Sequence, residues 1–233
     1  MIVFNEAEHT YQNKETGKFY TSVSKLLSLY KEPFDKEFHA ARKAKKEGVS
    51  KEEILEKWNK DNKTACDKGQ TVHDIIERYL TDAEVLDEKI ISDICSVFEK
   101  DDYKLIRSEH LVWNDDYEIA GTSDLICDVD NNTFDVFDFK TNKKFLFENP
   151  YGKYLKHPLN NLQQCQYNDY SLQLSLYAYM YSNYANKKVR KICIFYHDGN
   201  KFHKYHVPYL FWDVCALLKH FAINHGQQTI SKN

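Results

Sequence analysis

The spacing of the hydrophobic positions changes along the chain, and each change predicts a change of secondary structure. Between Val72 and Leu80 the apolar residues recur every three or four positions, which is typical of an amphipathic helix. From residue 104 to residue 140 the chain instead shows short runs rich in β-branched and aromatic residues, which are typical of strands. The pattern predicts a mainly helical first part followed by a sheet.

The same reasoning gives the expected elements along the whole chain. We expect short β segments before residue 21, and serine and threonine side chains at residues 21–24 that cap a following helix. Further helices are predicted at 36–46, 50–60, 72–80, 87–98, 171–184 and 212–223, and strands at 104–113, 118–129, 133–140, 190–197 and 201–207. This order favours one α/β domain with a mixed sheet.

Composition narrows the class of protein. The 233 residues are 42% hydrophobic and carry a formal net charge of -3, so a large core is expected and a surface coated in basic charge is not. A local basic groove remains compatible with this charge. No apolar run approaches the roughly 18 residues of a membrane helix, and the first residues do not resemble a signal peptide. We therefore expect a cytoplasmic protein without a membrane partner.

Six cysteines are scattered along the chain, and no two of them form a CxxC pair. This spacing predicts reduced thiols that are mostly buried. It gives little support to a structural zinc site or an iron–sulfur cluster.

The segment GTSDLICDVDNNTFDVFDFKTNK, residues 121–143, places acidic residues inside two strand-like runs. Side chains alternate between the faces of a strand, so Asp138 and Lys140 share one face and Phe139 points to the other. If residues 130–132 form the turn, Asp124 lies opposite Asp138, at a Cβ separation of roughly 5 Å. A two-residue loop would shift this register and separate the two carboxylates.

Two carboxylates this close repel one another unless a cation lies between them. A divalent cation prefers oxygen ligands, lowers the pKa of a bound water and offsets charge on a phosphate oxygen. A neighbouring lysine can orient or deprotonate that water. Asp124, Asp138 and Lys140 therefore form a candidate site for phosphodiester hydrolysis, although an exposed hairpin with an ordinary Asp–Lys pair would show the same short motif.

Two further motifs make this interpretation more specific. The segment KGQTVHDIIERYL places Gly69, His73 and Glu77 at spacings of four, and LQLSLYAYM places Gln173 and Tyr177 at the same spacing. Together with GTSD and DFK, these segments resemble the GxxxHxxxE, QxxxY, GxxD and DxK motifs of the PD-(D/E)XK nuclease superfamily, specifically its RecB-like branch. The motifs span residues 69–177 in the order of that branch, and the chain is most similar to its stand-alone phage and mitochondrial genome-maintenance exonucleases.

The resemblance implies a fold and a domain organisation. It implies a restriction-endonuclease-like α/β core, with a mixed central β-sheet flanked by helices and a mainly helical N-terminal portion. Residues 1–233 would form a single nuclease domain. Within it, residues 1–100 would hold the β segments and the His73 helix, residues 101–207 the catalytic sheet and the QxxxY helix, and residues 208–233 the last helix and tail.

The resemblance also implies a set of site residues. The implied catalytic residues are Asp124, Asp138, Lys140, Gln173 and Tyr177. The implied ligands of Mg²⁺ or Mn²⁺ are His73, Asp124, Asp138 and the backbone carbonyl of Phe139, with Glu77 and Glu109 in support. Plainer interpretations stay open, because His73 could be a histidine at the edge of the core, Gln173 a paired core amide, and the two glutamates ordinary surface charges.

Two features of related nucleases are not expected here. Beyond Tyr177 the chain has only Cys193 and Cys215, far apart, whereas relatives with an iron–sulfur cluster carry three clustered cysteines there. We therefore expect no cluster. There is also no GxxxxGK[ST] motif, so a helicase or recombination partner would be a separate chain.

Nucleic acid is the natural substrate of such a site. The candidate DNA contacts are Ser22, Ser24, Arg42, Thr141 and Lys143. Four tyrosines in the connection before the QxxxY helix could stack on single-stranded bases or merely pack the loop: Tyr151, Tyr154, Tyr167 and Tyr170. The expected activity is a metal-dependent DNA exonuclease that acts at a single-stranded end. The alternatives are a flap or structure-specific endonuclease and a catalytically inactive DNA-binding module.

Overall fold

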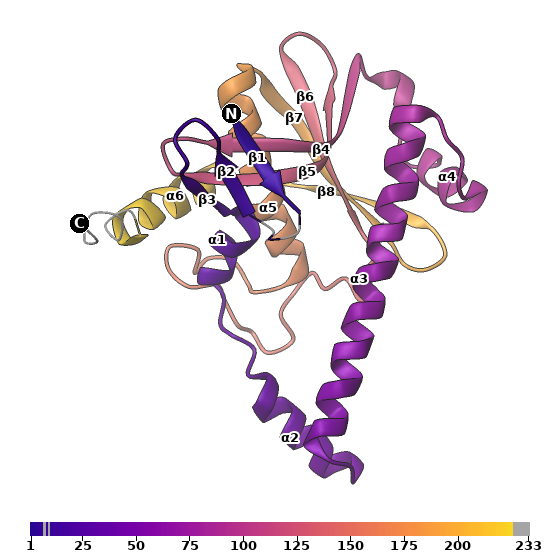
Figure 1. Ribbon diagram of the computed structural model, residues 1–233, viewed down its shortest axis with the longest axis vertical. Coiled ribbons are helices and arrows are strands. Elements are labelled where there is room, and N and C mark those ends of the chain that lie inside the picture. The colour runs from indigo at the N-terminus through magenta and orange to yellow at the C-terminus, as the bar shows by residue number, and fades with distance from the viewer. Residues whose placement is uncertain (7, 9, 226–233) are drawn as a thin grey trace.

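The computed structural model describes residues 1–6, 8 and 10–225, and in this part of the chain eight strands form one sheet with helices on both faces (Figure 1). The strands are β1 (Ile2–Asn5), β2 (Thr10–Asn13), β3 (Phe19–Ser22), β4 (Leu105–Asn114), β5 (Ile119–Asp128), β6 (Thr133–Lys140), β7 (Lys188–His197) and β8 (Phe202–Val207). The helices are α1 (Val23–Leu29), α2 (Lys36–Glu47), α3 (Lys51–Asp82), α4 (Glu88–Cys95), α5 (Gln166–Ala185) and α6 (Phe211–His225), with a 3-10 turn at Lys100–Asp102. The predicted mixed α/β fold is confirmed.

Strand β5 is the centre of the sheet. The strands follow the order β1-β2-β3-β5-β6-β7-β8, and β4 runs antiparallel along the other edge of β5. β3 pairs parallel with the start of β5, at Ile119 and Ala120, and β6 pairs antiparallel with its end, from Leu125 to Asp128. Residues 121–124 therefore lie in a gap between β3 and β6, where no described strand pairs with this edge of β5.

Each face of the sheet carries its own core. On one face, Ile126 and Val136 pack with Tyr177 of α5 and with buried residues of α1 and α6. On the other face, Leu125 and Phe137 pack with apolar residues of α3 and α4, among them Val72, Ile76 and Ile94. The helix carrying His73 and the helix carrying Gln173 thus cover opposite faces of the same two central strands.

Helix α3 is longer than the sequence pattern indicated. Separate helices at 50–60 and 72–80 were predicted, but the structure has one helix of 32 residues, and the prediction of a break was wrong. It begins with a capping box, in which the Glu53 amide donates to Ser50 Oγ at 3.1 Å and the Ser50 amide donates to Glu53 Oε2 at 2.8 Å. Residues 59–68 are exposed on every side, so they show no apolar periodicity, yet they contain no proline that would end the helix.

The first half of α3 projects from the body of the molecule together with α2 (Figure 1). Ala40 and Ala44 of α2 pack on Ile54 of α3 in a small core at the far end of this projection. Leu55 and Trp58 extend that core. The projection is therefore a two-helix tip carried on an exposed stretch of α3.

Other expectations can be compared with the described residues. Ser22 caps α1, as its Oγ accepts a hydrogen bond from the Lys25 amide at 3.2 Å. All six cysteines are free, and Cys127, Cys165 and Cys193 are buried, but Cys66 and Cys95 are exposed, which corrects the expectation of mostly buried thiols. Among the described helices, none has both the length and the apolar character to cross a bilayer.

Candidate functional site

The β5–β6 hairpin has the register that the sequence predicted. Leu125 pairs with Phe137 and Asp128 with Phe134, so the next pair would be Asp124 and Asp138. The ladder stops one step before that pair. Instead, the Phe139 amide donates to Oδ2 of Asp124 at 2.8 Å, so the carboxylate takes the place of a strand partner. Asp124 is held by this bond at the edge of the gap in the sheet.

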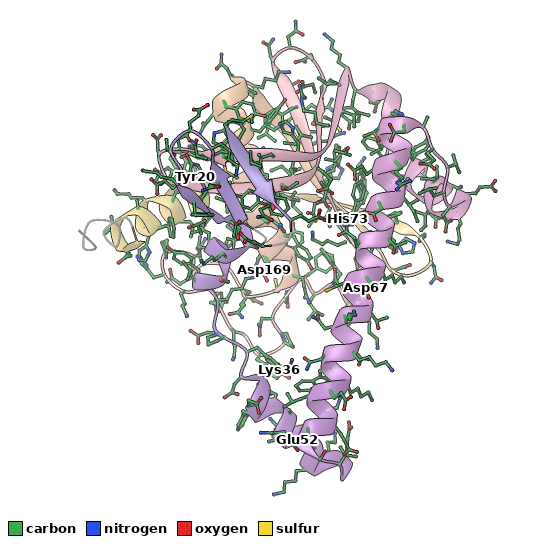
Figure 2. All side chains as sticks on the ribbon, in the orientation of Figure 1. Tyr20, Lys36, Glu52, Asp67, His73 and Asp169 are labelled. Carbon is green, nitrogen blue, oxygen red and sulfur yellow. The ribbon has the colours of Figure 1, made fainter. Side chains whose placement is uncertain are left out.

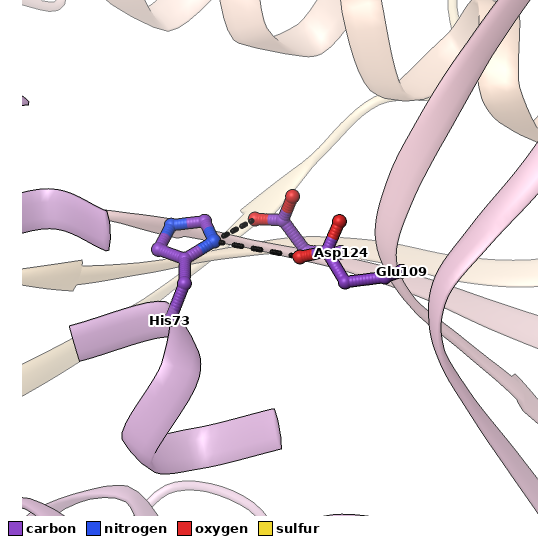
Figure 3. A group of neighbouring side chains, drawn as sticks. All are labelled: His73, Glu109 and Asp124. Atoms are coloured by element: carbon purple, nitrogen blue, oxygen red, sulfur yellow. Dashed lines mark ion pairs between the residues drawn. The ribbon is translucent and has the colours of Figure 1, made fainter. Parts of the chain in front are cut away.

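His73 reaches the same place from α3. Its Nε2 donates to the carbonyl oxygen of Phe139 at 3.0 Å, and its ring meets the Phe139 ring edge-on. Nδ1 then faces the carboxylates of Asp124 and Glu109, at 3.6 and 3.9 Å (Figure 3). A histidine whose far nitrogen donates to a backbone carbonyl is oriented as metal-binding histidines are, with the other nitrogen free to accept. The Phe139 carbonyl, predicted as a metal ligand, here orients His73.

The charged side chains around His73 are mostly acidic. Burial disfavours the imidazolium, but Asp124, Glu109 and Asp138 outweigh it and raise the pKa of His73 to about 9. In the absence of a metal, a proton on His73 therefore offsets part of the negative charge of the cluster.

Glu109 enters the cluster through an unusual backbone conformation. Its φ is 44°, in the left-handed region, although it lies in the middle of β4. Its neighbours Ser108 and His110 pair with Leu125 and Ser123, whereas Glu109 itself makes no ladder pair with β5. Non-glycine residues rarely adopt this conformation, and strain of this kind concentrates at functional sites.

The three side chains fit a divalent cation. One ligand atom each from His73, Glu109 and Asp124 can be chosen so that all lie within 4.8 Å of one another. They border a cavity of about 10 Å³, which is close to the space of one water molecule. Glu77 lines the same cavity, and burial, together with Glu109 and Asp74, raises its pKa. One imidazole with hard carboxylate oxygens suits Mn²⁺ or Mg²⁺.

Asp138 and Lys140 form a second, buried pair. Lys140 Nζ lies 2.5 Å from Asp138 Oδ2, and the Asp138 side chain is only 1% exposed. Apart from this ion pair, neither oxygen of Asp138 has a hydrogen-bond partner among the described residues. Burial and the nearby Asp124 raise the pKa of Asp138. Burying a carboxylate with so few partners is energetically unfavourable, and a bound cation would offset this cost.

The ring of Tyr170 covers Lys140 from the other side. Lys140 Nζ lies 4.9 Å from the ring centroid, and the Tyr170 hydroxyl donates to Asn142 Oδ1 at 3.3 Å. Burial disfavours the charged ammonium, but Asp138 and Asp124 outweigh it and raise the pKa of Lys140. The Lys140 ammonium is therefore held in place by Tyr170 and Asp138, and its charged form is favoured.

Gln173 and Tyr177 lie together behind the gap in the sheet. Gln173 Nε2 donates to the Tyr177 hydroxyl at 2.9 Å, so this amide is paired within its own helix. The Tyr177 ring lies against the backbone of Gly121, where an added Cβ would stand only 2.6 Å from Cε1. Gly121 is thus required by the close approach of Tyr177, and the two family-like motifs meet by direct contact.

An open groove of about 470 Å³ runs beside the pair. It is lined by Asn62, Ala65, Cys66, Gly69, Gln70, His73, Phe139, Lys140, Thr141, Asn142 and Tyr170. A Cβ at Gly69 would stand 3.2 Å from Thr141 Oγ1, so the absence of a side chain lets α3 lie close to the end of β6. Lys140 therefore faces this groove, whereas Asp138 does not line it.

The predicted DNA contacts are not all in one place. Thr141 lines the groove, and Lys143 is exposed two residues beyond it. Ser22 and Ser24 lie at the start of α1, and Arg42 is exposed on α2 in the projecting tip. Among the four tyrosines, Tyr151 and Tyr154 are exposed, Tyr170 lines the groove, and Tyr167 packs on Phe147.

Some site residues were not found from the sequence. Asn62, Cys66 and Gln70 line the groove, and counting back from His73 in steps of three and four along a continuous helix would have indicated Asn62 and Cys66. The assumed break in α3 prevented this. The left-handed backbone of Glu109 has no sequence signal, because glutamate is not typical of that conformation.

Comparison with known proteins gives only distant similarities. No protein family matches the chain, and no curated protein matches it. A crystal structure of SSO0001 has a TM-score of 0.41 at 14% identity, covering 88% of this chain and 75% of that one. A structure from Eubacterium rectale named "Putative exonuclease" has a TM-score of 0.36 at 12% identity, covering 86% of this chain and 68% of that one. Similarities at this level do not assign a family.

Proposed function

We propose that this protein is a divalent-metal-dependent nuclease that hydrolyses phosphodiester bonds of DNA. The observation that supports this most directly is the convergence of His73, Glu109 and Asp124 beside the buried pair of Asp138 and Lys140. The resemblance of the four motifs to RecB-like nucleases supports the same conclusion independently of the geometry.

Each side chain has a task in this proposal. His73, Glu109 and Asp124 would hold Mg²⁺ or Mn²⁺, with Asp138 close enough to share its charge. The bound cation would lower the pKa of a water and offset charge on a phosphate oxygen. Lys140 supplies a second positive charge, and because Asp138 and Asp124 raise its pKa, it acts as a proton-bearing donor toward the phosphate rather than as a base.

The groove is the proposed path of the substrate backbone. It is open to solvent, and its lining combines residues of α3 with Lys140 and Thr141, which can donate to phosphate oxygens. Tyr170 holds the ammonium of Lys140 in place from the opposite side. Gln173 supports the hydroxyl of Tyr177, so its task is to position α5 behind the site.

We further propose that cleavage starts from a single-stranded DNA end, on the basis of the resemblance to stand-alone exonucleases. A flap endonuclease and an inactive DNA-binding module are the alternatives. Labelled linear single-stranded, linear duplex and circular single-stranded DNA would be incubated with Mg²⁺ or Mn²⁺, and with EDTA as control. Lys140→Ala would be compared with Lys219→Ala, an exposed lysine on α6.

The outcomes separate the three activities. Degradation of linear DNA only, lost in EDTA and in Lys140→Ala but kept in Lys219→Ala, is the expected result for an exonuclease. Cutting of the circle would instead show an endonuclease. DNA binding without metal-dependent cleavage of any substrate would leave the inactive module and contradict the proposed catalysis.

A further inference from the structure

The start of α2 carries an exposed aromatic surface on the projection. Phe34 and Phe38 are 66% and 59% exposed. The Phe34 ring stacks on His39 with centroids 4.6 Å apart, and it lies 6.2 Å from the ring of Trp58. Phe38 meets His39 edge-on. Phe34, Phe38, His39 and Trp58, called here the tip platform, therefore present ring faces and edges to solvent around the small core of the tip.

Helix α2, which carries Phe38 and His39 of the tip platform, is net basic, although the chain is acidic overall. Helix α2 carries five basic residues against two acidic ones, whereas the whole chain has a net charge of -3. The basic residues are Lys36, Arg42, Lys43, Lys45 and Lys46. Lys43 Nζ lies 5.6 Å from the centroid of the Trp58 ring. Exposed aromatic rings mixed with lysine and arginine suit an unpaired nucleic-acid strand, in which bases can stack and phosphates need cations.

Helix α3 connects the tip platform to the site in a straight line. Trp58, Asn62, Ala65, Gly69 and His73 follow one another at spacings of four, three, four and four, so they share one face of the helix. All of them except Trp58 line the groove. Figure 2 shows the course of the helix, with His73 beside the sheet, Asp67 further along and Glu52 at the far end. Lys36 at the start of α2 donates from Nζ to Asn59 Oδ1 of α3 at 2.5 Å. Trp58 and His73 are fifteen residues apart, which is about 22 Å along the axis.

We infer that a single DNA strand lies along this face of α3, and that the tip platform binds the strand about 22 Å from the scissile bond. Small side chains at Ala65 and Gly69 leave room for the strand to lie close to the helix. The exposed stretch of α3, residues 59–68, is the part that the strand would cover. This inference rests on the proposed function, because it takes the groove as the path of a nucleic acid.

Two free thiols allow a test that does not depend on cleavage. Cys66 lines the groove between the site and the tip, whereas Cys95 is exposed beside a different pocket, next to Tyr79. The protein would be alkylated with and without a phosphorothioate-linked dodecanucleotide that resists hydrolysis, in Mg²⁺ and in EDTA, and the two cysteines would be quantified by mass spectrometry. We expect the single strand to slow alkylation of Cys66 and to leave Cys95 unchanged.

A second measurement addresses the tip platform itself. Phe34→Ala/Phe38→Ala removes two exposed rings and leaves the small core of Ala40, Ala44 and Ile54 intact, which circular dichroism would verify. We expect this variant to bind the dodecanucleotide at least roughly tenfold more weakly, and to bind a trinucleotide as the wild type does. Trp212→Ala, which removes an aromatic ring that is 81% exposed on α6, is the matched control and should change neither affinity.

The outcomes distinguish this inference from the proposed function. If the wild-type protein shows no metal-dependent cleavage but the single strand still slows alkylation of Cys66, the proposed catalysis is overturned and the strand path is kept. Normal cleavage with Cys66 unprotected, or with unchanged affinity in the double variant, would overturn the strand path and keep the catalysis. Protection of Cys66 by duplex but not by single-stranded DNA would overturn the stacking argument, and a protein partner seated on the tip would leave Cys66 equally reactive with and without DNA.

Discussion

Glu109 stands opposite Asp124 in the register of β4 and β5, yet it pairs with no residue of that strand. The flanking residues pair as Ser108 with Leu125 and His110 with Ser123, and Glu109 between them has a φ of 44°. This turn of the backbone places its Oε1 3.9 Å from His73 Nδ1. One pair of the β4–β5 ladder is therefore missing where Glu109 brings a second carboxylate to the cluster of His73 and Asp124.

Two replacements of Glu109 distinguish the effect of the backbone strain from the effect of the carboxylate. Glu109→Gly and Glu109→Ala both remove the ligand, but only glycine adopts a positive φ without steric cost. We expect Glu109→Gly to exceed Glu109→Ala in free energy of unfolding by about 1 kcal/mol. Both variants should lose the stabilisation by Mn²⁺ that is expected of the wild type. Denaturant unfolding with and without Mn²⁺ measures both effects, and equal stabilities of the two variants would show that the backbone conformation is not strained.

Gly121 allows the motif helix α5 to lie against β5. An added Cβ would approach Tyr177 Cε1 to 2.6 Å and Val23 Cγ2 to 3.3 Å, and the ring of Tyr177 is buried and cannot move freely. We expect Gly121→Ala to lower the free energy of unfolding by about 2 kcal/mol.

A double-mutant cycle provides the control for this prediction. Tyr177→Leu removes the ring edge that the new Cβ would meet, so Gly121→Ala should cost clearly less in a Tyr177→Leu background. Gly69→Ala is a milder comparison, because its nearest atom is the hydroxyl of Thr141 at 3.2 Å. Equal costs of Gly121→Ala in both backgrounds would mean that the contact with Tyr177 does not explain the glycine.

The predictable part of the fold depended on local patterns. The hairpin register followed from the three-residue turn at 130–132, and the Val129 amide does donate to the Thr133 carbonyl at 3.0 Å. Capping by Ser22 followed from a short side chain that accepts a hydrogen bond from a nearby amide. These features are set by residues close together in sequence, so the sequence alone was sufficient.

The remainder depended on contacts between distant segments. The gap in the sheet arises because β3 joins one part of β5 and β6 another, and no pattern within β3 predicts its partner. The Phe139 amide that binds Asp124 is available only because the ladder ends there. The continuity of α3 was missed because its exposed middle lacks an apolar face, which hydrophobic spacing needs as its signal.

Asp128 makes the stability of the sheet depend on pH. It is buried, and it accepts from Arg107 at 2.8 Å and from the Tyr181 hydroxyl at 3.1 Å, with Lys187 Nζ at 2.8 Å. Burial disfavours the carboxylate, but Lys187 and Arg107 outweigh it and lower the pKa of Asp128 from its usual value. Because the folded pKa lies below the unfolded one, this stabilisation is complete above the unfolded pKa and is lost as the pH falls through the folded pKa.

Asp128→Asn should therefore lower the free energy of unfolding by about 2 kcal/mol at neutral pH. The difference from the wild type should shrink once the pH falls below about 4. Urea unfolding at a series of pH values measures this, with Asp116→Asn in the exposed turn before β5 as the control. A difference that stays constant to the lowest pH at which the protein folds would show that charge is not the source of the stabilisation.

Asp124→Asn should lose metal binding, whereas Lys140→Met should keep metal binding and lose catalysis. A cation that binds the folded chain raises its melting temperature in proportion to the logarithm of its concentration above Kd. We expect Mn²⁺ to raise the melting temperature of the wild type and to have little effect on Asp124→Asn, which removes a charged ligand but keeps an acceptor for the Phe139 amide. Lys140→Met keeps the apolar stem of the side chain, and no ligand atom is lost. This variant should therefore retain the rise in melting temperature with Mn²⁺, while the cleavage rate falls by roughly a hundredfold or more.

Thermal melts at several Mn²⁺ concentrations, compared with cleavage rates of the same preparations, measure both effects. An Mn²⁺ shift that survives in Asp124→Asn would place the cation elsewhere, and a Lys140→Met variant that cleaves at the wild-type rate would remove the lysine from the proposed chemistry.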